Sequence, residues 1–460
     1  MRRSAEVRSH KHFSSFFLCV IHSLSLFSPM KITSLLLAAS LALPAGAQTP
    51  APVDSFNLRR SLCDIALEQP LFKTYPQQTP YRIPAIAATQ AGHLLALTDY
   101  RPCGADIGYG RVDLRYRISY NNGTTWSPEL VLAQGDGIKG SLTCGYGDAA
   151  VVADSRSGEV IVVCVTGNTV YGAATTTREN PNRVAILRST DNGRTWSDPE
   201  DITESIYSLF DKSKLGPVQS LFFGSGRICQ SRLVRIGRYH RLYAALCARP
   251  GGNRVVYSDD FGRSWQPLGS IDKSPAPQGD EPKVEELPNG DVVLSSRMWG
   301  GRYFNTFSYI SQRKATGMWA EPIASTQALR GVVAQQNACN GEILMVDAID
   351  HKTGKSVPVV LQSVPLGPGR TRVGIYYKPL YSPYDYQTPA LFAANWRGPY
   401  EVTPLSSAYS TMILQPDGRI GFFYEEATYG AEAAYTEMYR PICLGQITNG
   451  EFRTLEESKR

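Results

Sequence analysis

The sequence predicts an all-β protein built as a six-bladed β-propeller. A glycine-centred turn followed by an apolar strand recurs six times, while helical periodicity is almost absent outside Thr203–Asp211. The turn glycines lie 51 to 79 residues apart, about 65 on average, and they are Gly92, Gly158, Gly237, Gly290, Gly341 and Gly418. Each is expected to be a hairpin turn leading into a strand. Six repeats of a several-stranded sheet are typical of a six-bladed propeller.

A second repeat, S-x-[DN]-x-G-x-[TS]-W, supports the same period. It occurs at Ser119–Trp126, Ser189–Trp196 and Ser258–Trp265, with tryptophans 70 and 69 residues apart, and a degenerate copy covers Ser311 to Trp319. The Asp or Asn side chain can accept hydrogen bonds from nearby backbone N–H groups, while the glycine takes a positive φ and the tryptophan fills the gap between strands. We therefore predict a structural role for this motif and no catalytic one.

Composition and charge exclude several classes of protein. With 42% hydrophobic and 19% charged residues, the chain is not mainly disordered. Its formal net charge is +6, of which the first 47 residues carry +4. The remaining +2 gives no sign of a nucleic-acid surface, so no nucleic-acid partner is expected.

Residues 1–47 are predicted to be an N-terminal extension with an export signal. From Met30 the chain has a charged start, then an apolar run over residues 34–43, then Ala45-Gly46-Ala47 as a cleavage site before Gln48. We expect the mature protein to begin at Gln48 and to be periplasmic or secreted. The apolar run is too short to span a membrane, so no transmembrane segment is expected.

The rest of the chain is expected to comprise a lead-in segment, residues 48–77, and a single propeller, residues 78–460. Eight cysteines follow residue 47, and an even number in an exported chain permits disulfides, but the sequence cannot choose among 105 connectivities. Cys164 and Cys247 lie within apolar runs and are expected to be buried core residues. No C-x-x-C pair or histidine cluster is present, so no zinc site is expected.

The S-x-[DN]-x-G-x-[TS]-W repeat resembles the Asp box of the bacterial-type (BNR) sialidases. Tyr81-Arg82-Ile83-Pro84 is similar to that family's Arg-Ile-Pro motif near the start of the first blade, and the resemblance covers roughly residues 78–455. It implies the sialidase propeller and a retaining exo-α-sialidase that hydrolyses terminal α-linked sialic acids. The implied partners are sialylated glycoproteins, gangliosides and oligosaccharides, and no metal or cofactor is required.

The resemblance implies three arginines that bind the substrate carboxylate, for which the rigid guanidinium fork is well suited. The first matches Arg82 and the second Arg302, in Trp299-Gly-Gly-Arg302. The third matches Arg370, in Arg370-Thr-Arg372-Val, with Arg372 as the alternative.

The resemblance also implies a tyrosine nucleophile, and Tyr409 matches it. A carboxylate nucleophile would approach an already anionic sugar, whereas a neutral tyrosine paired with a base avoids that repulsion; sialidases are the tyrosine exception among glycosidases. Glu286 is the predicted base, because the family's glutamate directly precedes the leucine of the Leu287-Pro-Asn-Gly turn. Glu285 should point to the other face of the strand.

The remaining site residues are also implied by the resemblance. Asp106 is the predicted general acid and base, with Asp99 and Asp113 as alternatives. Glu425 is expected to orient the first arginine, and Arg101 and Asp148 to contact the 4-hydroxyl of the sugar.

Other functions remain open at this point. A trans-sialidase, or a glycosidase for a different 2-keto sugar acid, would use the same residues. A non-catalytic carbohydrate-binding propeller predicts the loss of Tyr409, Glu286 or Asp106 equivalents, and none is lost. An Asp-box glycosidase that acts on plant glucans through paired aspartates does not explain the three arginines.

Overall fold

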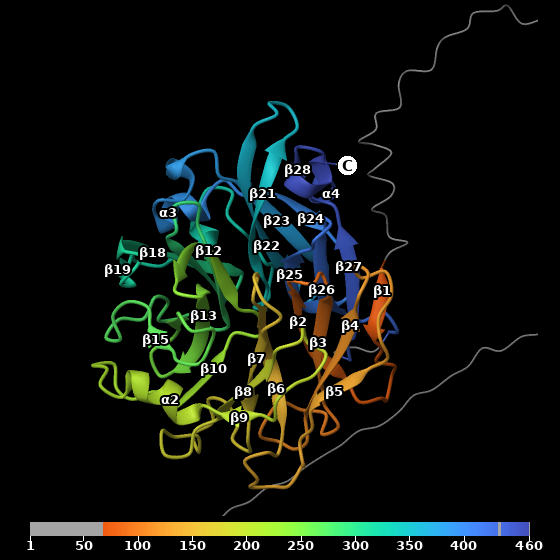
Figure 1. The fold of residues 1–460 in the computed structure, drawn as a ribbon, viewed down its shortest axis with the longest axis vertical. Coiled ribbons are helices and arrows are strands. Elements are labelled where there is room, and N and C mark those ends of the chain that lie inside the picture. Colours follow the sequence, from red (N-terminus) through yellow and green to blue (C-terminus); the bar gives the residue numbers. More distant parts are fainter. Residues whose placement is uncertain (1–67, 431–433, 460) are drawn as a thin grey trace, which may run out of the picture. The chain divides into compact units, whose positions relative to one another are not determined.

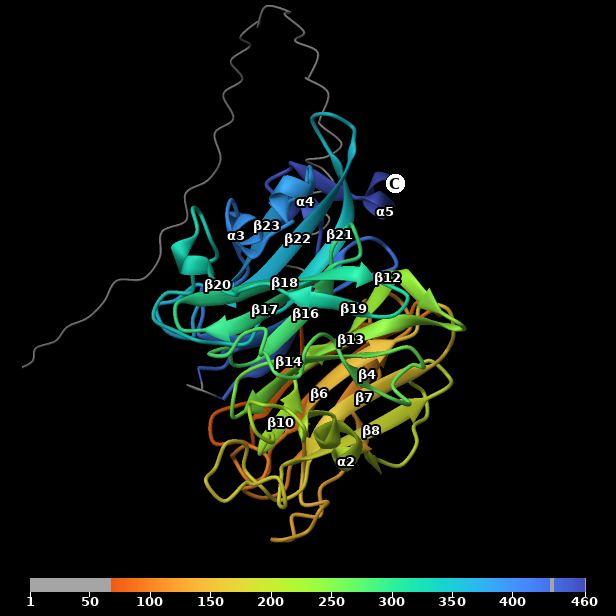
Figure 2. The same cartoon turned by 90° about the vertical axis from the view of Figure 1, so that its left-hand side faces the viewer.

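Six sheets, antiparallel except for the short strand β11, form the blades of a propeller in the computed structural model, which describes residues 68–430 and 434–459 (Figure 1). The colours pass around the ring in chain order, and the view turned by 90° shows the same sheets from the side (Figure 2). The predicted all-β, six-bladed fold is therefore confirmed. The predicted signal segment lies outside the described residues.

The first three blades follow the chain from residue 81 to residue 267. Blade 1 contains β2 (Tyr81–Ala88), β3 (Leu94–Tyr100), β4 (Asp113–Ser119) and β5 (Leu130–Ala133). Blade 2 contains β6 (Tyr146–Ala153), β7 (Val160–Thr166), β8 (Arg183–Ser189) and β9 (Glu200–Asp201), with β11 (Gly226–Arg227) parallel to β6. Blade 3 contains β10 (Ser220–Phe223), β12 (Cys229–Ile236), β13 (Tyr239–Arg249), β14 (Arg254–Ser258) and β15 (Gln266–Pro267).

The other three blades complete the ring. Blade 4 contains β16 (Pro282–Glu286), β17 (Val292–Met298), β18 (Gly301–Ser311), β19 (Thr316–Trp319) and β20 (Ile323–Ala324). Blade 5 contains β21 (Ile343–Asp350), β22 (Ser356–Pro365), β23 (Val373–Pro379), β24 (Arg397–Glu401) and β28 (Phe452–Thr454). Blade 6 contains β25 (Ser407–Leu414), β26 (Ile420–Glu426), β27 (Thr436–Ile442) and β1 (Gln69–Phe72).

Helices in the described residues are short and lie in connections. They are α2 (Thr203–Tyr207), α3 (Pro389–Ala393), α4 (Leu444–Ile447) and α5 (Leu455–Ser458), with 3-10 turns at η2 (Ser208–Phe210), η3 (Ser325–Gln327) and η4 (Pro383–Asp385). The segment predicted as helical, Thr203–Asp211, contains α2 and η2.

Strand β1 closes the ring by pairing with β27, with Gln69 opposite Tyr439 and Pro70 opposite Met438. The predicted lead-in, residues 48–77, therefore contains a blade strand, and the propeller boundary at residue 78 is wrong. Pairing a strand from the start of the chain with a sheet near its end leaves the last blade joined to the first.

Four of the six predicted glycine turns connect the first and second strands of a blade, and Gly237 connects β12 to β13 in blade 3. Gly341 is the exception, because it lies two residues before the blade 5 strand β21, while Gly354, with a φ of 69°, lies in the β21–β22 hairpin. A Cβ at Gly341 would lie 1.9 Å from the carbonyl oxygen of Ser363, so this glycine permits a close backbone approach and is not a turn residue.

The Asp-box motifs are closed turns between the third and fourth strands of blades 1 to 3. In blade 2, Ser189 Oγ accepts a hydrogen bond from Gly193 N at 2.9 Å, and Asp191 Oδ1 accepts one from Thr195 N at 2.9 Å. Gly193 has a φ of 82°. These contacts confirm the structural role of the motif.

Apolar side chains pack between neighbouring blades and fix their positions. One buried cluster joins Leu95 and Leu97 of blade 1 to Val151 and Val162 of blade 2. Cys164 and Cys247 are buried and free, as predicted for core residues. Such close packing holds the strand ends, where the candidate site lies, in fixed relative positions.

Candidate active site

The candidate site lies where the first strands of several blades begin and the second strands end. In an antiparallel pair these two ends meet at one edge of the sheet. Arg82 stands at the start of β2, Glu281 directly before β16, and Tyr409 near the start of β25. The second strands β3, β17 and β26 each carry a charged residue at the next-to-last position: Asp99, Arg297 and Glu425.

The first strands β2, β6 and β25 each contain a backbone irregularity near the site. The pairing register shifts between Arg82 and Ala85, between Gly147 and Ala150, and between Ser407 and Ser410. Ile83 and Asp148 have φ values of 65° and 54°, and residues other than glycine rarely adopt this region. Bulges of this kind redirect side chains and are common beside active sites.

The buried carboxylate of Glu425 joins two of these bulges. Its Oε1 accepts hydrogen bonds from Arg82 Nε at 2.7 Å and Ile83 N at 2.8 Å, and its Oε2 accepts one from Tyr409 N at 2.9 Å. Burial by itself raises the pKa of Glu425, but Arg82 and these donors outweigh it and hold the pKa below its usual value. The structure thus brings Glu425 and Arg82 together, as the sequence predicted.

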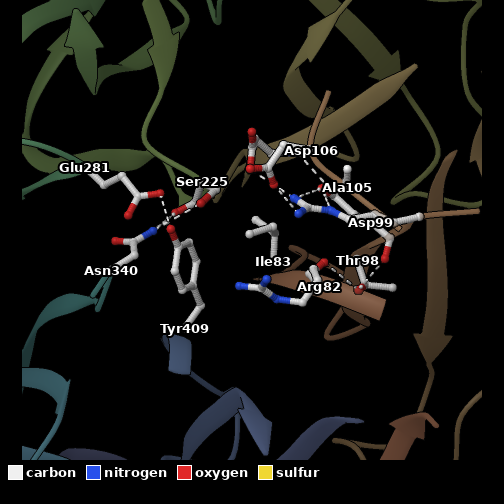
Figure 3. Close-up of polar contacts among 12 residues, drawn as sticks. Arg82, Ile83, Thr98, Asp99, Ala105, Asp106, Ser225, Glu281, Asn340 and Tyr409 are labelled. Carbon is white, nitrogen blue, oxygen red and sulfur yellow. Dashed lines mark hydrogen bonds and ion pairs between the residues drawn. The ribbon is translucent and has the colours of Figure 1, made fainter. Parts of the chain in front are cut away.

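The hydroxyl of Tyr409 contacts the carboxylate of Glu281 (Figure 3) and the guanidinium group of an arginine in blade 4. It donates a 2.6 Å hydrogen bond to Glu281 Oε1 and accepts one from Arg297 Nη1 at 3.2 Å. Arg297 Nη1 also lies 2.7 Å from Glu281 Oε2. Burial, and then the negative charge of Glu281, raise the pKa of Tyr409 well above its usual value, so the phenol is neutral with a carboxylate ready to accept its proton.

Two further guanidinium groups face the ring of the same tyrosine. The guanidinium carbons of Arg82 and Arg370 lie 5.5 and 5.6 Å from the centroid of the Tyr409 ring. With Arg297 at the hydroxyl, three cations from blades 1, 4 and 5 surround one neutral side chain. The arrangement fits an anionic group, since several guanidinium groups can bind one carboxylate by charge-assisted hydrogen bonds.

The predicted pairing of Tyr409 with Glu286 is wrong. Glu286 is fully buried and accepts hydrogen bonds from Ser231 Oγ, Arg232 N and Leu233 N. It ends β16, whereas Glu281 directly precedes that strand. Five residues of extended chain span about 16 Å, so Glu286 lies at the far end of the strand from Tyr409.

The prediction that Arg302 binds the substrate carboxylate is also wrong. Its guanidinium is fully buried and donates to Ser295 Oγ at 2.9 Å and to the carbonyl oxygen of Cys339 at 3.0 Å. Burial lowers the pKa of Arg302 to about 10. Arg302 is the cross-strand partner of Arg297, but it belongs to the third strand of the blade, one strand farther along the sheet from the first strand.

The geometry favours Arg370 over its alternative. Arg372 forms an ion pair with Glu401 at 2.6 Å and is nearly half exposed, whereas Arg370 faces Tyr409. Arg370, three residues before β23, thus faces the site, whereas Arg372, directly before β23, pairs with the edge strand β24.

Arg101 connects the other predicted residues of blade 1 and blade 2. It forms ion pairs with Asp106 and with Asp99, the latter at 2.8 Å, and lies 3.9 Å from Asp148 Oδ1. Asp106 is 72% exposed, while Asp99 is buried. Of the three candidate acids, Asp106 is therefore the one that solvent and a substrate can reach.

Asp113, the third candidate acid, does not join this group. Its buried carboxylate accepts hydrogen bonds from Arg111 Nε at 2.9 Å, from Arg115 Nη2 at 2.6 Å and from Gly135 N at 3.1 Å. The carboxylate of Asp113 thus bonds to neighbouring groups of blade 1 and to none of the site residues named above.

Sequence reasoning missed Glu281 and Arg297. A positional signal existed, because Arg82 opens a first strand and Glu425 nearly ends a second strand, and the equivalent positions of blade 4 are Glu281 and Arg297.

Among the residues that the structure describes, no group of three His, Cys, Asp or Glu side chains could hold a metal ion. No helix in that part of the chain is long and apolar enough to cross a membrane.

Comparison with known proteins places this geometry in context. A family model described as a BNR repeat-like domain matches residues 92–421. A sialidase from Micromonospora viridifaciens is 26% identical over 359 residues, which are 76% of this chain and 50% of that protein. A sialidase from Paraclostridium sordellii is 28% identical over 283 residues, 60% of this chain and 65% of that protein. The chain thus spans about half to two thirds of the length of these relatives.

Solved structures share the fold. The Hadza microbial sialidase Hz136 superposes with a TM-score of 0.61 at 23% identity, covering 80% of this chain and 66% of that one. The intramolecular trans-sialidase from Ruminococcus gnavus, in complex with oseltamivir carboxylate, gives a TM-score of 0.62 at 15% identity, covering 84% and 99%. Both likenesses support the same propeller architecture.

Proposed function

Because this chain belongs to the BNR (Asp-box) sialidase family, we propose that it is a retaining exo-α-sialidase that releases terminal α-linked sialic acid from glycans. One observation carries the proposal: the Tyr409–Glu281 hydrogen bond is surrounded by Arg82, Arg297 and Arg370. A paired nucleophile and a cluster of cations at one point suit a sugar whose anomeric carbon bears a carboxylate.

Substrate binding begins with that carboxylate. Arg82, Arg297 and Arg370 bind it and so place the anomeric carbon over the Tyr409 hydroxyl. Glu425 keeps Arg82 in position through its 2.7 Å contact. Arg101 and Asp148, next to each other at the blade 1 and blade 2 edge, contact hydroxyl groups of the ring.

The first chemical step forms a covalent bond to the enzyme. Tyr409 Oη attacks the anomeric carbon while its proton passes to Glu281, and the bond to the leaving glycan breaks as Asp106 gives a proton to the glycosidic oxygen. Positioned proton transfer of this kind contributes about 10²- to 10⁴-fold to the rate. Arg297, which contacts both Tyr409 and Glu281, stabilises the negative charge on the pair before the proton moves.

The second step returns the enzyme to its starting state. Asp106, now a carboxylate, accepts a proton from a water molecule. The oxygen of that water attacks the anomeric carbon from the side that the glycan left. The bond to Tyr409 Oη breaks, and Glu281 returns the proton to the phenol. Two inversions at one carbon give net retention.

The test is product release from defined sialosides. The full chain is incubated with α2,3-, α2,6- and α2,8-linked sialosides, and products are separated by mass spectrometry; NMR at early times distinguishes the α from the β anomer. We expect free sialic acid that appears first as the α anomer. Tyr409→Phe keeps the ring and removes one oxygen, so it should fold normally and lose this activity.

Each other outcome has a clear meaning. Release of no sialic acid from any linkage by the folded protein refutes the proposal. Sugar transferred to an acceptor, or an anhydro product one water lighter, identifies a trans-sialidase in place of a hydrolase. First appearance of the β anomer refutes the retaining mechanism.

A further inference from the structure

We infer that Asp99 is a positioning residue that fixes Arg101, and through it the acid Asp106, against the bulged backbone at Asp148. This inference rests on the proposed function, since it concerns the residue that protonates the leaving group. We give Asp99 no contact with substrate, because its side chain is fully buried; Figure 3 shows Asp99 in the same group of side chains as Asp106.

The two oxygens of Asp99 have separate partners. Oδ2 accepts hydrogen bonds from Arg101 Nη2 at 2.8 Å and Nε at 3.3 Å. Oδ1 accepts one from Asp148 N at 3.0 Å. Arg101 then extends past Asp99, and its Nη1 pairs with Asp106 Oδ1. The exposed acid is thus tied to the sheet through two consecutive ion pairs.

Asp99 occupies the same place in blade 1 that Glu425 occupies in blade 6. Both are the next-to-last residue of a seven-residue second strand. Each carboxylate reaches the first strand of the next blade around the ring and binds the N–H of its bulged residue, which is Ile83 for Glu425 and Asp148 for Asp99. Each also binds a site arginine, so the propeller uses one device twice.

The neighbouring backbone is shaped to admit this carboxylate. Asp148 adopts a φ of 54°, which is unfavourable for a residue with a side chain, and the Asp99 contact compensates part of that cost. At Gly147 a Cβ would lie 2.7 Å from Asp99 Oδ2 and 2.7 Å from Ile107 Cδ1. A glycine therefore stands where any side chain would displace Asp99.

Asp99→Asn is the sharpest variant, because it keeps the size of the side chain and changes one acceptor into a donor. Whichever way the amide turns, its NH₂ group faces either Arg101 or Asp148 N, both of which are donors. Arg101 should lose its fixed orientation, and Asp106 should lose its alignment with the leaving oxygen.

The matched control is Asp113→Asn in the same blade. Asp113 is equally buried and also accepts from arginine side chains and one backbone N–H, but its partners are Arg111, Arg115 and Gly135, outside the site. We compare kcat/KM on sialyllactose, whose sugar leaving group needs a proton, with kcat/KM on an aryl sialoside, whose phenolate leaves without one.

For Asp99→Asn we expect the loss on sialyllactose to exceed the loss on the aryl sialoside at least tenfold, while Asp113→Asn reduces both equally. In an Asp106→Ala background, Asp99→Asn should cost far less on sialyllactose than in the wild type, since residues that act together are not additive. Equal losses on both substrates, or the full loss in the Asp106→Ala background, would overturn the inference.

A folding defect would not leave the question open. If Asp99→Asn does not fold, Gly147→Ala keeps every charge, displaces the carboxylate, and is expected to show the same selective loss on sialyllactose; equal losses again overturn the inference. Failure of the wild-type chain to release sialic acid from either substrate refutes the proposed function, whereas an active wild type with unselective variants refutes the role of Asp99 alone.

Discussion

The hydroxyl of Tyr409 lies 2.6 Å from Glu281 Oε1, although the two residues are 128 positions apart and belong to different blades. The contact joins the start of a first strand in blade 6 to the residue before the first strand of blade 4. The phenol is buried and neutral, and its hydroxyl donates to the carboxylate of Glu281.

Glu281 and Glu286 should therefore respond in opposite ways to the same substitution. Glu281→Gln removes the proton acceptor with little change of shape, so kcat should fall about 10²- to 10⁴-fold with a nearly unchanged melting temperature. Glu286→Gln replaces one buried acceptor oxygen by an NH₂ donor that faces the donors Ser231 Oγ or Arg232 N, so it should cost about 1 to 3 kcal/mol of stability and leave kcat near the wild type. Kinetics and thermal unfolding of both variants check this, and the reverse pattern would restore Glu286 as the base.

The variants Arg297→Ala and Arg302→Ala form a second matched comparison. A charge-assisted hydrogen bond contributes about 1.5 to 3 kcal/mol, so Arg297→Ala should weaken binding of a sialic acid analogue roughly 10- to 150-fold. Arg302→Ala leaves buried acceptors at Ser295 and Cys339 unpaired and should mainly lower stability. Calorimetric titration of the folded variants decides between the two, and similar binding losses for both would contradict the assignment.

Asp106 should matter in proportion to how much the leaving group needs a proton. Asp106→Ala is expected to lose about 10²- to 10⁴-fold on sialyllactose and much less on an aryl sialoside. Because Asp106 is 72% exposed, its replacement should leave the melting temperature unchanged. Steady-state kinetics on both substrates give the ratio, and equal losses would show that Asp106 serves binding or structure.

The pH dependence of stability should carry a signature of Asp99. Burial raises its pKa from 3.8 to about 6, although Arg101 opposes the shift. Between about pH 4 and pH 6 the folded protein keeps a proton that the unfolded chain has lost, so the free energy of unfolding falls as pH rises, by up to about 3 kcal/mol from this group. The ionisable groups that face it are Arg101, Asp106, Asp148, Glu437 and Cys164.

Asp99→Asn removes this titration, so its unfolding free energy should fall less than that of the wild type across the same window. Urea unfolding of both proteins from pH 4 to pH 7 measures the difference. Parallel curves would mean that the pKa of Asp99 is the same in the folded and unfolded states.

Local motifs by themselves determined much of this protein. The Asp-box turns close within eight residues, and four of the five hairpin glycines, Gly92, Gly237, Gly290 and Gly418, have a positive φ. The sequence therefore predicts both kinds of turn directly and, from their spacing, the number of blades. The resemblance to sialidase motifs located Arg82, Arg370 and Tyr409, which the structure brings to one point.

Only the tertiary structure decided which residues meet Tyr409. Glu286 was predicted by its position before Leu287, and strand alternation separated it only from Glu285. Neither observation says which end of the strand lies at the site, where the structure has Glu281. Likewise, Arg297 and Arg302 are cross-strand partners. Arg297 belongs to the second strand and contacts the tyrosine, whereas Arg302 belongs to the third strand and is buried. These choices depend on how sheets distant in the chain pack around a common axis, and that packing is set by contacts between blades, which no single segment encodes.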